Sequence, residues 1–90
     1  MTNKEVARGF IRKLPLSSSN LYSTEDGKLF SYNTCIAQHL YDEIIGNSTK
    51  YSVTTSKHLG YIKNYITIWT PSNVRIPIGT RDLTPYLNTL

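Results

Sequence analysis

The dipeptide Asp26-Gly27 most constrains the fold of this chain, because it is a strong signal for a β-hairpin. A two-residue type I′ turn needs positive φ at both positions, and Asp and Gly tolerate this conformation. We therefore predict a hairpin over residues 21–37. Side chains alternate between the two faces of a strand, and the second arm of the hairpin carries apolar side chains on both faces. We therefore expect this arm to be a central strand. One predicted face carries Leu29, Cys35 and Ala37, and the other carries Phe30, Tyr32 and Ile36.

Two segments have the apolar spacing of amphipathic helices. In residues 2–14, Thr2 and Glu5 have the spacing of a capping box, and Pro15 ends the segment. In residues 54–70, apolar side chains recur at steps of three, four and three residues, and Pro71 follows. Thr54 or Thr55 is the expected N-cap of this second helix. Its predicted buried face consists of Leu59, Ile62, Ile66 and Trp69.

The remaining segments complete a small α+β fold. Residues 43–53 predict a third strand, and residues 74–78 predict an edge strand, where Pro77 is tolerated. The last residues, with Thr80 and Thr84 as caps, form a turn of helix or fray. At 90 residues we expect a single domain spanning 1–90. The predicted architecture is a three-stranded antiparallel sheet, with a fourth edge strand, packed by the N-terminal helix and the longer helix at 54–70.

Composition excludes several classes of protein. No apolar run approaches the roughly 20 residues of a membrane span, and no signal-peptide pattern opens the chain, so we expect a cytoplasmic protein that does not contact membranes. The only cysteine, Cys35, excludes an internal disulfide and a zinc framework. Ten basic and six acidic side chains give a net charge of +4, with no run of three basic residues. This charge allows an anionic partner without requiring one.

Nothing in the sequence has the pattern of a catalytic site. The carboxylates fall at predicted helix starts, turns or the tail, where caps and solvated charges are common. Ser52 or Ser56 beside His58 is the nearest approach to a nucleophile–base pair, but it lacks an orienting acid nearby in the sequence. We therefore expect a protein that is not an enzyme and has no cofactor or metal. The carboxylates are Glu5, Glu25, Asp26, Asp42, Glu43 and Asp82.

The densest polar stretch, residues 50–58, lies at the predicted junction between the third strand and the second helix. The first turn of a helix presents N–H groups without partners and the positive end of the helix dipole, which together attract phosphate or carboxylate. The alternative is that the hydroxyl groups only cap the helix and the lysines are solvated. Tyr32 or Tyr51 could stack on bases. The candidate anion-binding residues are Lys50, Tyr51, Thr54, Thr55, Ser56, Lys57 and His58, with Tyr32 beside them.

Two segments, 29–37 and 51–58, together with Asn20 and Asp26-Gly27, resemble a set of small uncharacterised proteins encoded mostly by bacteriophages and other prokaryotic viruses. The shared pattern is L-x-S-Y-x-T-x-I-A followed by Y-S-x-T-T-S-K-H. The family favours Gly where this chain has Asn33, although Asn tolerates positive φ better than most residues. The resemblance implies a viral origin and the cytoplasm of an infected bacterium. It brings no established function.

Two functions of different classes fit these observations best. The first is a nucleic-acid-binding accessory module that holds phosphates at the start of the second helix. The second is a protein that binds and inhibits a host enzyme or an anti-phage defence nuclease, for which small size and seven tyrosines are suitable. A virion component and a protein that sequesters a small molecule are further alternatives. The sequence leaves open whether the chain forms a homodimer.

Overall fold

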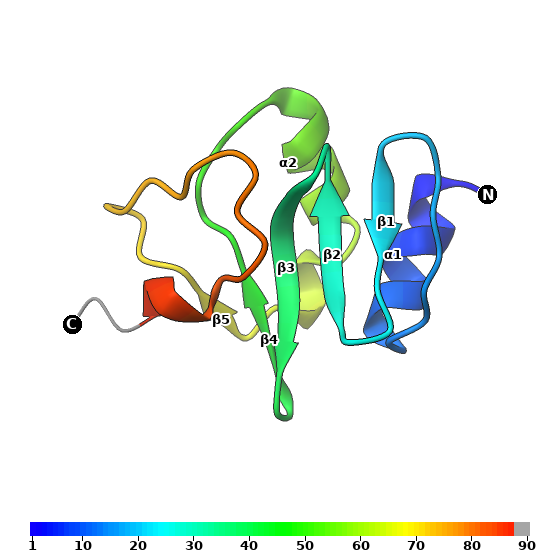
Figure 1. Cartoon of the computed structure of the whole chain (residues 1–90), viewed down its shortest axis with the longest axis horizontal. Helices are drawn as coiled ribbons and strands as arrows, with labels where there is room; N and C mark the ends of the chain where they lie inside the picture. The colour runs from blue at the N-terminus through cyan, green and yellow to red at the C-terminus, as the bar shows by residue number, and fades with distance from the viewer. Residues whose placement is uncertain (88–90) are drawn as a thin grey trace.

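The computed structural model describes residues 1–87 and has an α+β fold, as predicted (Figure 1). Five strands, rather than three, form one mixed sheet in the order β1-β2-β3-β4-β5. The first four strands are antiparallel, and β5 pairs with β4 in parallel. The strands are β1 (Leu21–Ser23), β2 (Lys28–Ser31), β3 (Thr34–Leu40), β4 (Glu43–Gly46) and β5 (Ile68–Trp69). The helices are α1 (Asn3–Ile11), α2 (Val53–Gly60) and the short 3-10 helices η1 (Lys63–Tyr65) and η2 (Thr84–Leu87).

The N-terminal helix α1 begins as predicted and ends earlier. Thr2 is the N-cap, and the capping box with Glu5 is confirmed. The helix stops at Ile11 because Lys13 takes a left-handed conformation, with φ of 59°. The N–H of Leu14 then donates to the carbonyl of Gly9 at 2.9 Å, and the N–H of Lys13 donates to the carbonyl of Phe10 at 3.0 Å. This Schellman pattern satisfies the last carbonyls before Pro15 is reached.

The β1–β2 hairpin lies where Asp26-Gly27 predicted it, but its turn is of another type. The connection spans residues 24–27, and the N–H of Gly27 donates to the carbonyl of Thr24 at 3.1 Å. Only Gly27, with φ of 84°, takes positive φ here. The expected two-residue type I′ turn, which would need positive φ at Asp26 too, is therefore wrong.

The predicted second arm is two strands, because the chain reverses at Tyr32-Asn33. Their φ angles of 50° and 68° are those that a two-residue type I′ turn requires. Asn33 thus occupies a backbone conformation that Gly or Asn adopts readily. The reversal pairs Cys35 with Phe30, so the prediction that Cys35 shares a face with Leu29 is wrong. Residues 34–37 nevertheless belong to β3, the middle strand of the five.

The region after β4 departs most from the sequence prediction. The third strand ends at Gly46 instead of continuing to residue 53. The helix expected over 54–70 is divided into α2, η1 and β5, and its N-cap is Ser52. Trp69 lies on β5 with 42 % of its surface exposed, so it is not part of a buried helix face. The edge strand expected at 74–78 is absent from the described residues, where this segment is irregular chain.

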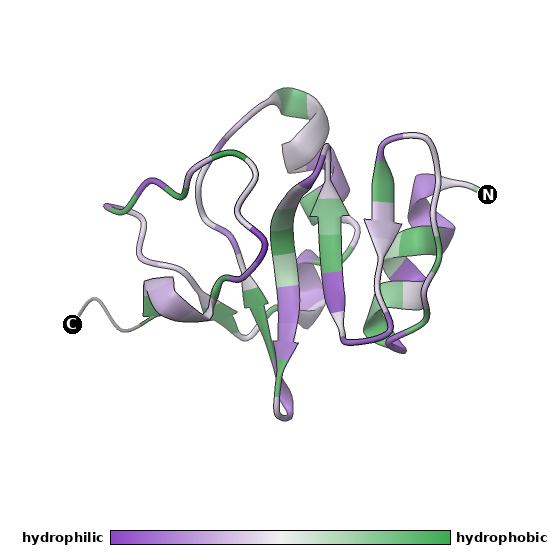
Figure 2. Cartoon of the chain, viewed as in Figure 1, coloured by the Kyte–Doolittle hydropathy of each residue, from purple (hydrophilic) through white to green (hydrophobic). Residues whose placement is uncertain are grey.

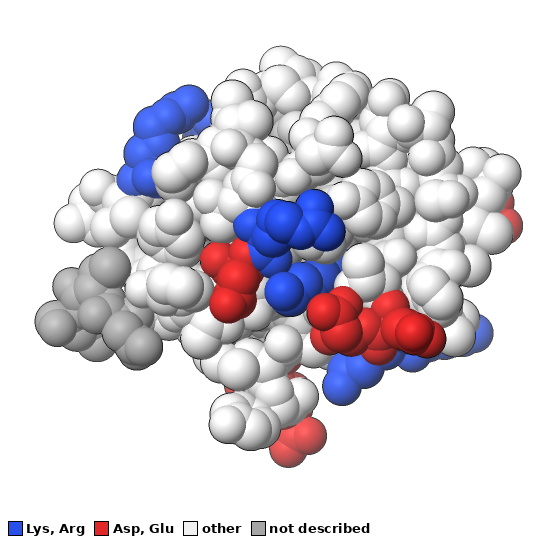
Figure 3. All heavy atoms as spheres, viewed as in Figure 1, with Lys and Arg blue, Asp and Glu red and all other residues white. Residues whose placement is uncertain are grey.

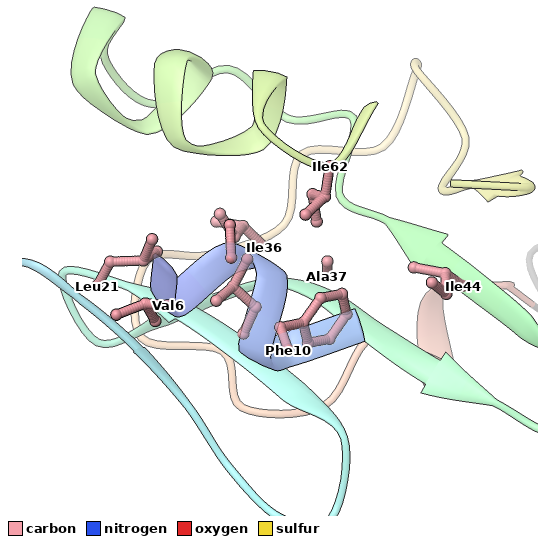
Figure 4. Packing of buried hydrophobic residues seen from close by; sticks show 9 residues of the cluster. Val6, Phe10, Leu21, Ile36, Ala37, Ile44 and Ile62 are labelled. Carbon is pink, nitrogen blue, oxygen red and sulfur yellow. The ribbon is translucent and has the colours of Figure 1, made fainter. Parts of the chain in front are cut away.

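Each face of the sheet has its own hydrophobic core, and Figure 2 shows hydrophobic stretches in the central strands β2 and β3. On the helix face, Val6 and Phe10 of α1 meet Ile62 and the sheet (Figure 4). On the opposite face, Ile76 and Leu83 of the C-terminal segment cover the sheet. The helix-face core contains Val6, Ala7, Phe10, Leu21, Leu29, Ile36, Ala37, Ile44 and Ile62, and the other contains Phe30, Cys35, Ile45, Ile76 and Leu83.

The C-terminal segment is fastened to the sheet by Gln38, a buried polar residue of β3. Its Oε1 accepts from the N–H of Leu83 at 2.7 Å, and its Nε2 donates to Asp82 Oδ1 at 3.1 Å and to Thr84 Oγ1 at 3.0 Å. The N–H of Cys35 also donates to the carbonyl of Thr80 at 2.8 Å. The helical turn predicted for the tail is confirmed as η2, while residues 88–90 lie outside the described chain.

Candidate functional site

The helix α2 divides the polar stretch 50–58 between the interior and the surface. Thr55 and His58 are buried, with 7 % and 1 % of their surface exposed. Ser56 and Lys57 are exposed on the same helix. This division follows from the helical repeat, which places residues three positions apart on one side of the helix. The stretch therefore has two separate roles, which the sequence alone did not distinguish.

The inward side chains join a hydrogen-bond network that ties α2 to α1 and β2. His58 Nδ1 lies 2.8 Å from Ser31 Oγ, and His58 Nε2 lies 3.2 Å from Asn3 Nδ2. Ser31 Oγ lies 3.3 Å from Thr55 Oγ1, which accepts from Ser52 Oγ at 3.2 Å. Ser18 donates to the carbonyl oxygen of the Asn3 side chain. We call this set the buried polar chain; its central members are buried, Asn3 and Ser18 are half-buried and Ser52 at its end is exposed. Its members are Ser18, Asn3, His58, Ser31, Thr55 and Ser52.

His58 is held neutral in this network. Burial lowers the pKa of its imidazole, and the positive charge of Lys57 lowers it further. With the Asn3 amide donating to Nε2, the ring proton sits on Nδ1 and donates to Ser31. His58 is thus enclosed in the fold, and Thr55 is buried with only 7 % of its surface exposed. The sequence hypothesis required both side chains to be accessible to an anion. The partner that the structure brings to His58 is Ser31 instead of Ser52 or Ser56, and Ser31 is 1 % exposed.

The start of α2 retains part of its predicted anion-binding capacity. The N–H of Thr55 donates to Ser52 Oγ at 3.1 Å, and the N–H of Ser56 donates to the Ser52 carbonyl at 3.0 Å. Both amides are therefore occupied. Within residues 1–87 no partner is found for the N–H groups of Val53 and Thr54, which lie on an exposed turn. A contact at this helix start can involve these two amides and not that of Thr55.

The two tyrosines predicted to stack on bases differ in exposure. Tyr32, at the β2–β3 turn, has 50 % of its surface exposed, and its ring stacks near His58 with centroids 6.1 Å apart. Tyr51 is half-buried, and its hydroxyl donates to the carbonyl of Ile76 at 2.6 Å. The Arg75 guanidinium lies over this ring, 5.9 Å from its centroid. Tyr32 remains open to a partner, whereas Tyr51 fastens the C-terminal segment.

A pocket of about 260 Å³ lies beside α2. Its apolar lining comes from Ile36, Leu59 and Trp69, and its polar lining includes several hydroxyl groups and two lysines. Since Ile36 and Leu59 pack with the helix-face core, the pocket opens on that face of the sheet. We call it the basic pocket. Its lining residues are Ile36, Asn47, Ser48, Thr49, Lys50, Thr55, Ser56, Leu59, Gly60, Lys63 and Trp69.

Of the residues that line this pocket, Lys50, Thr55 and Ser56 were predicted as anion-binding residues, whereas Lys63 and Trp69 were not. Both missed residues were assigned to one long helix, with Trp69 in its buried face. One sequence signal could have shown that Trp69 does not belong to the helix: the β-forming run Thr67-Ile68-Trp69-Thr70, which ends directly before Pro71. Successive side chains of a strand point to opposite faces, so a strand places Trp69 differently from a helix.

A second pocket, of about 390 Å³, lies on the other side of the α2 start. Tyr32 and Ile78 line its rim together with Ser52 and Thr54. Ile78 is 75 % exposed, and Val53, between two lining residues, is 88 % exposed. This pocket is therefore bordered by exposed apolar side chains rather than by lysines. The full lining is Ser31, Tyr32, Thr34, Tyr51, Ser52, Thr54, Thr55 and Ile78.

The net charge of the chain is distributed unevenly between its halves. Residues 1–43 carry five basic and five acidic side chains, whereas residues 44–90 carry five basic ones and only Asp82. No carboxylate side chain occurs from residue 44 to residue 81, the segment that contributes nearly all of the basic pocket. By contrast, on the face shown in Figure 3, Lys and Arg atoms lie next to Asp and Glu atoms. The segment 44–81 is thus the part of the chain with the strongest attraction for an anion.

The family comparison covers most of this region. A family model described as a family of unknown function (DUF8033) matches residues 11–67. The chain belongs to the DUF8033 family. The match includes Tyr32, the whole stretch 50–58 and every residue of the basic pocket except Trp69. Comparison with curated proteins and with solved structures finds no match. The bacteriophage origin expected for this DUF8033 member stays a prediction.

The described part of this DUF8033 chain lacks the features of several other kinds of site. Within residues 1–87 there is no group of three His, Cys, Asp or Glu side chains that could hold a metal ion. Burial raises the pKa of the Cys35 thiol to about 12, so it stays protonated at neutral pH. None of the helices in those residues has the length and apolar character needed to cross a membrane.

Proposed function

We propose that this chain is a non-enzymatic nucleic-acid-binding protein of a bacteriophage. The observation that carries the proposal is the carboxylate-free segment 44–81, whose lysines surround the basic pocket and the outer face of α2. Lysine ammonium groups attract backbone phosphates and release condensed counterions when they bind. The contacting side chains are Lys50, Lys57 and Lys63, with Ser56 and the Thr54 backbone as hydrogen-bond donors.

This proposal uses only part of the predicted anion-binding set. Lys50, Thr54, Ser56 and Lys57 are exposed and are retained, and half-exposed Tyr32 lies across the α2 start from them. Thr55, His58 and Tyr51 are committed to internal hydrogen bonds and are left out. Their replacement is Lys63, which lines the basic pocket from η1.

The proposal is tested by fluorescence anisotropy with labelled single-stranded DNA, double-stranded DNA and RNA. Three lysine–phosphate contacts on a single strand predict that affinity falls about 20-fold between about 50 and 200 mM salt. No binding to any of these probes at about 50 mM salt would contradict the proposal. Binding that does not weaken with salt would contradict the role given to the lysines.

A second candidate function is the inhibition of a host protein, for which the second pocket is the relevant observation. Tyr32, Val53 and Ile78 expose 50 %, 88 % and 75 % of their surfaces around it. Exposed aromatic and aliphatic side chains that border a pocket are typical of protein interfaces. Affinity capture from a bacterial lysate separates this candidate from the first. One specific protein that remains bound after nuclease treatment, and that the variant Ile78→Asp releases, favours inhibition.

A further inference from the structure

The basic pocket has the size and lining for one flat, partly apolar group. Its volume of about 260 Å³ lies just below the roughly 300–1,000 Å³ of pockets for drug-sized ligands. The apolar wall includes the aromatic ring of Trp69, which is 42 % exposed. Hydroxyl groups of Thr49 and Ser56 line the same space. A planar heterocycle with hydrogen-bonding edges fits this combination better than a purely apolar ligand does.

The Trp69 ring is fixed in place by the sheet beneath it. Gly46 of β4 pairs with Trp69 of β5, and a Cβ at Gly46 would lie 2.9 Å from the ring. A Cβ there would also lie 2.8 Å from the side chain of Ile66. The indole therefore rests directly on the backbone of β4, with its remaining surface exposed beside the pocket. A fixed aromatic face loses little conformational freedom when a second ring stacks on it.

Two cations line the pocket, and they come from different parts of the chain. Lys50 follows β4, and Lys63 lies in η1. Both are exposed, and no carboxylate lines the pocket with them. A ligand with negative charge on each side of a flat ring would meet both ammonium groups. A nucleobase within a nucleic-acid strand has this arrangement, because phosphates precede and follow it.

We infer that the basic pocket receives one unpaired nucleobase of a single strand, stacked on Trp69, while Lys50 and Lys63 contact the phosphates on either side. This inference rests on the proposed function and names its substrate class. Stacking on an aromatic side chain needs a base whose face is open, as in a single strand. In a duplex the base faces are covered by neighbouring pairs. The protein therefore prefers single-stranded nucleic acid to duplex.

The only tryptophan of the chain is Trp69, so its own fluorescence reports on the pocket. We expect single strands about ten nucleotides long to quench this fluorescence saturably, and duplexes of the same length to bind about tenfold more weakly. A mononucleotide supplies the base without the second phosphate, so it should bind more weakly than the strand. A mononucleotide that binds as tightly as the strand would overturn the assignment to a strand.

Two variants test the pocket itself by anisotropy with labelled strands. Trp69→Ala should lower single-strand affinity about tenfold and leave duplex affinity unchanged, because stacking is lost and the lysines remain. Tyr65→Ala removes an aromatic side chain, 56 % exposed, that does not line the pocket, and should change neither affinity. Equal losses for strand and duplex in Trp69→Ala would overturn the inference.

A filling variant covers the case in which Trp69→Ala fails to fold. Gly60 lines the pocket at the end of α2, and a Cβ there meets no atom within 4 Å. Gly60→Leu should therefore fold and reduce single-strand binding several-fold, whereas Gly60→Ala should bind as the parent chain does. If single-stranded and duplex probes bind equally and Trp69 fluorescence does not change, the base pocket is refuted while phosphate binding remains. Binding of neither probe would refute the proposed function itself.

Discussion

The buried polar chain and the basic pocket lie on neighbouring sides of the same short helix, share Thr55, and are built from the same kinds of residue. In the buried polar chain, Thr55 and His58 are buried, and within residues 1–87 every buried side-chain nitrogen or oxygen atom has a hydrogen-bond partner. In the basic pocket, Ser56 and the lysines face solvent. The difference teaches that hydroxyl, imidazole and ammonium groups in one motif do not share one role. Their position on the helical repeat decides which are structural.

The largest expected effect comes from breaking the buried side. His58→Ala leaves Asn3 and Ser31 without their partner and opens a cavity between α1, β2 and α2. We expect the free energy of unfolding to fall by about 3 kcal/mol, since both an unmade buried hydrogen bond and a cavity are costly. Urea denaturation followed by circular dichroism measures it. Lys57→Ala, the exposed neighbour, should stay within about 0.5 kcal/mol of the parent chain.

The next effect comes from the exposed side. The double variant Lys50→Gln/Lys63→Gln should lower single-strand affinity about tenfold at about 50 mM salt, and should reduce the salt slope by about 0.7 for each lost phosphate contact. The free energy of unfolding should not change, because both side chains are exposed. The control Lys4→Gln/Arg8→Gln removes the same charge from exposed positions of α1. If the control weakens binding equally, net charge rather than the pocket explains the affinity.

A smaller effect tests whether Thr55 belongs to the interior. Thr55→Val keeps the shape of the side chain but removes the oxygen that lies 3.3 Å from Ser31 Oγ. We expect a loss of about 1 kcal/mol in the free energy of unfolding and no change in nucleic-acid affinity. Thr54→Val, one residue away and exposed, should leave stability almost unchanged. Loss of binding in Thr55→Val, with stability retained, would return Thr55 to the binding surface.

The smallest effect is on pH dependence. The pKa of His58 is lowered in the folded chain by burial and by Lys57, so the unfolded chain takes up the proton first as pH falls. The stability that neutral His58 provides is therefore present above its ordinary pKa of about 6.5 and decreases as pH falls below it. Urea midpoints at pH 7 and pH 5 should show this decrease. His58→Gln should remove it, and a decrease of equal size in that variant would assign the effect to other groups.

Local signals in the sequence were sufficient where neighbouring residues determine the structure. Thr2 and Glu5 satisfy each other's backbone across one helical turn, so the start of α1 was predicted correctly. The β1–β2 hairpin was also located correctly, since Gly27 supplies the positive φ that the turn needs. The Tyr32-Asn33 turn was missed because Tyr is unusual at a φ of 50°, so the strand pattern seemed continuous.

The region of the site could not be predicted in the same way, because long-range pairing determines it. The apolar spacing after residue 58 is helical, at Leu59, Ile62, Ile66 and Trp69. Ile68 and Trp69 nevertheless pair with β4, so this part of the segment is a strand and not a helix. Pairing with a strand more than 20 residues away can outweigh local helix propensity. Lys63, which precedes this strand, lines the same pocket as Lys50. The candidate site was therefore predicted in part: Lys50, Thr55 and Ser56 were predicted, and Lys63 of η1 and Trp69 of β5 were not.

Nuclear magnetic resonance titration of the labelled chain with a single strand tests the division of α2 most directly. The account predicts that the largest amide shifts occur at Lys50, Ser56 and Lys63, together with the Trp69 indole. The ring resonances of His58 should stay nearly constant. Shifts centred on His58 and Ser31, or on the C-terminal segment, would contradict the account.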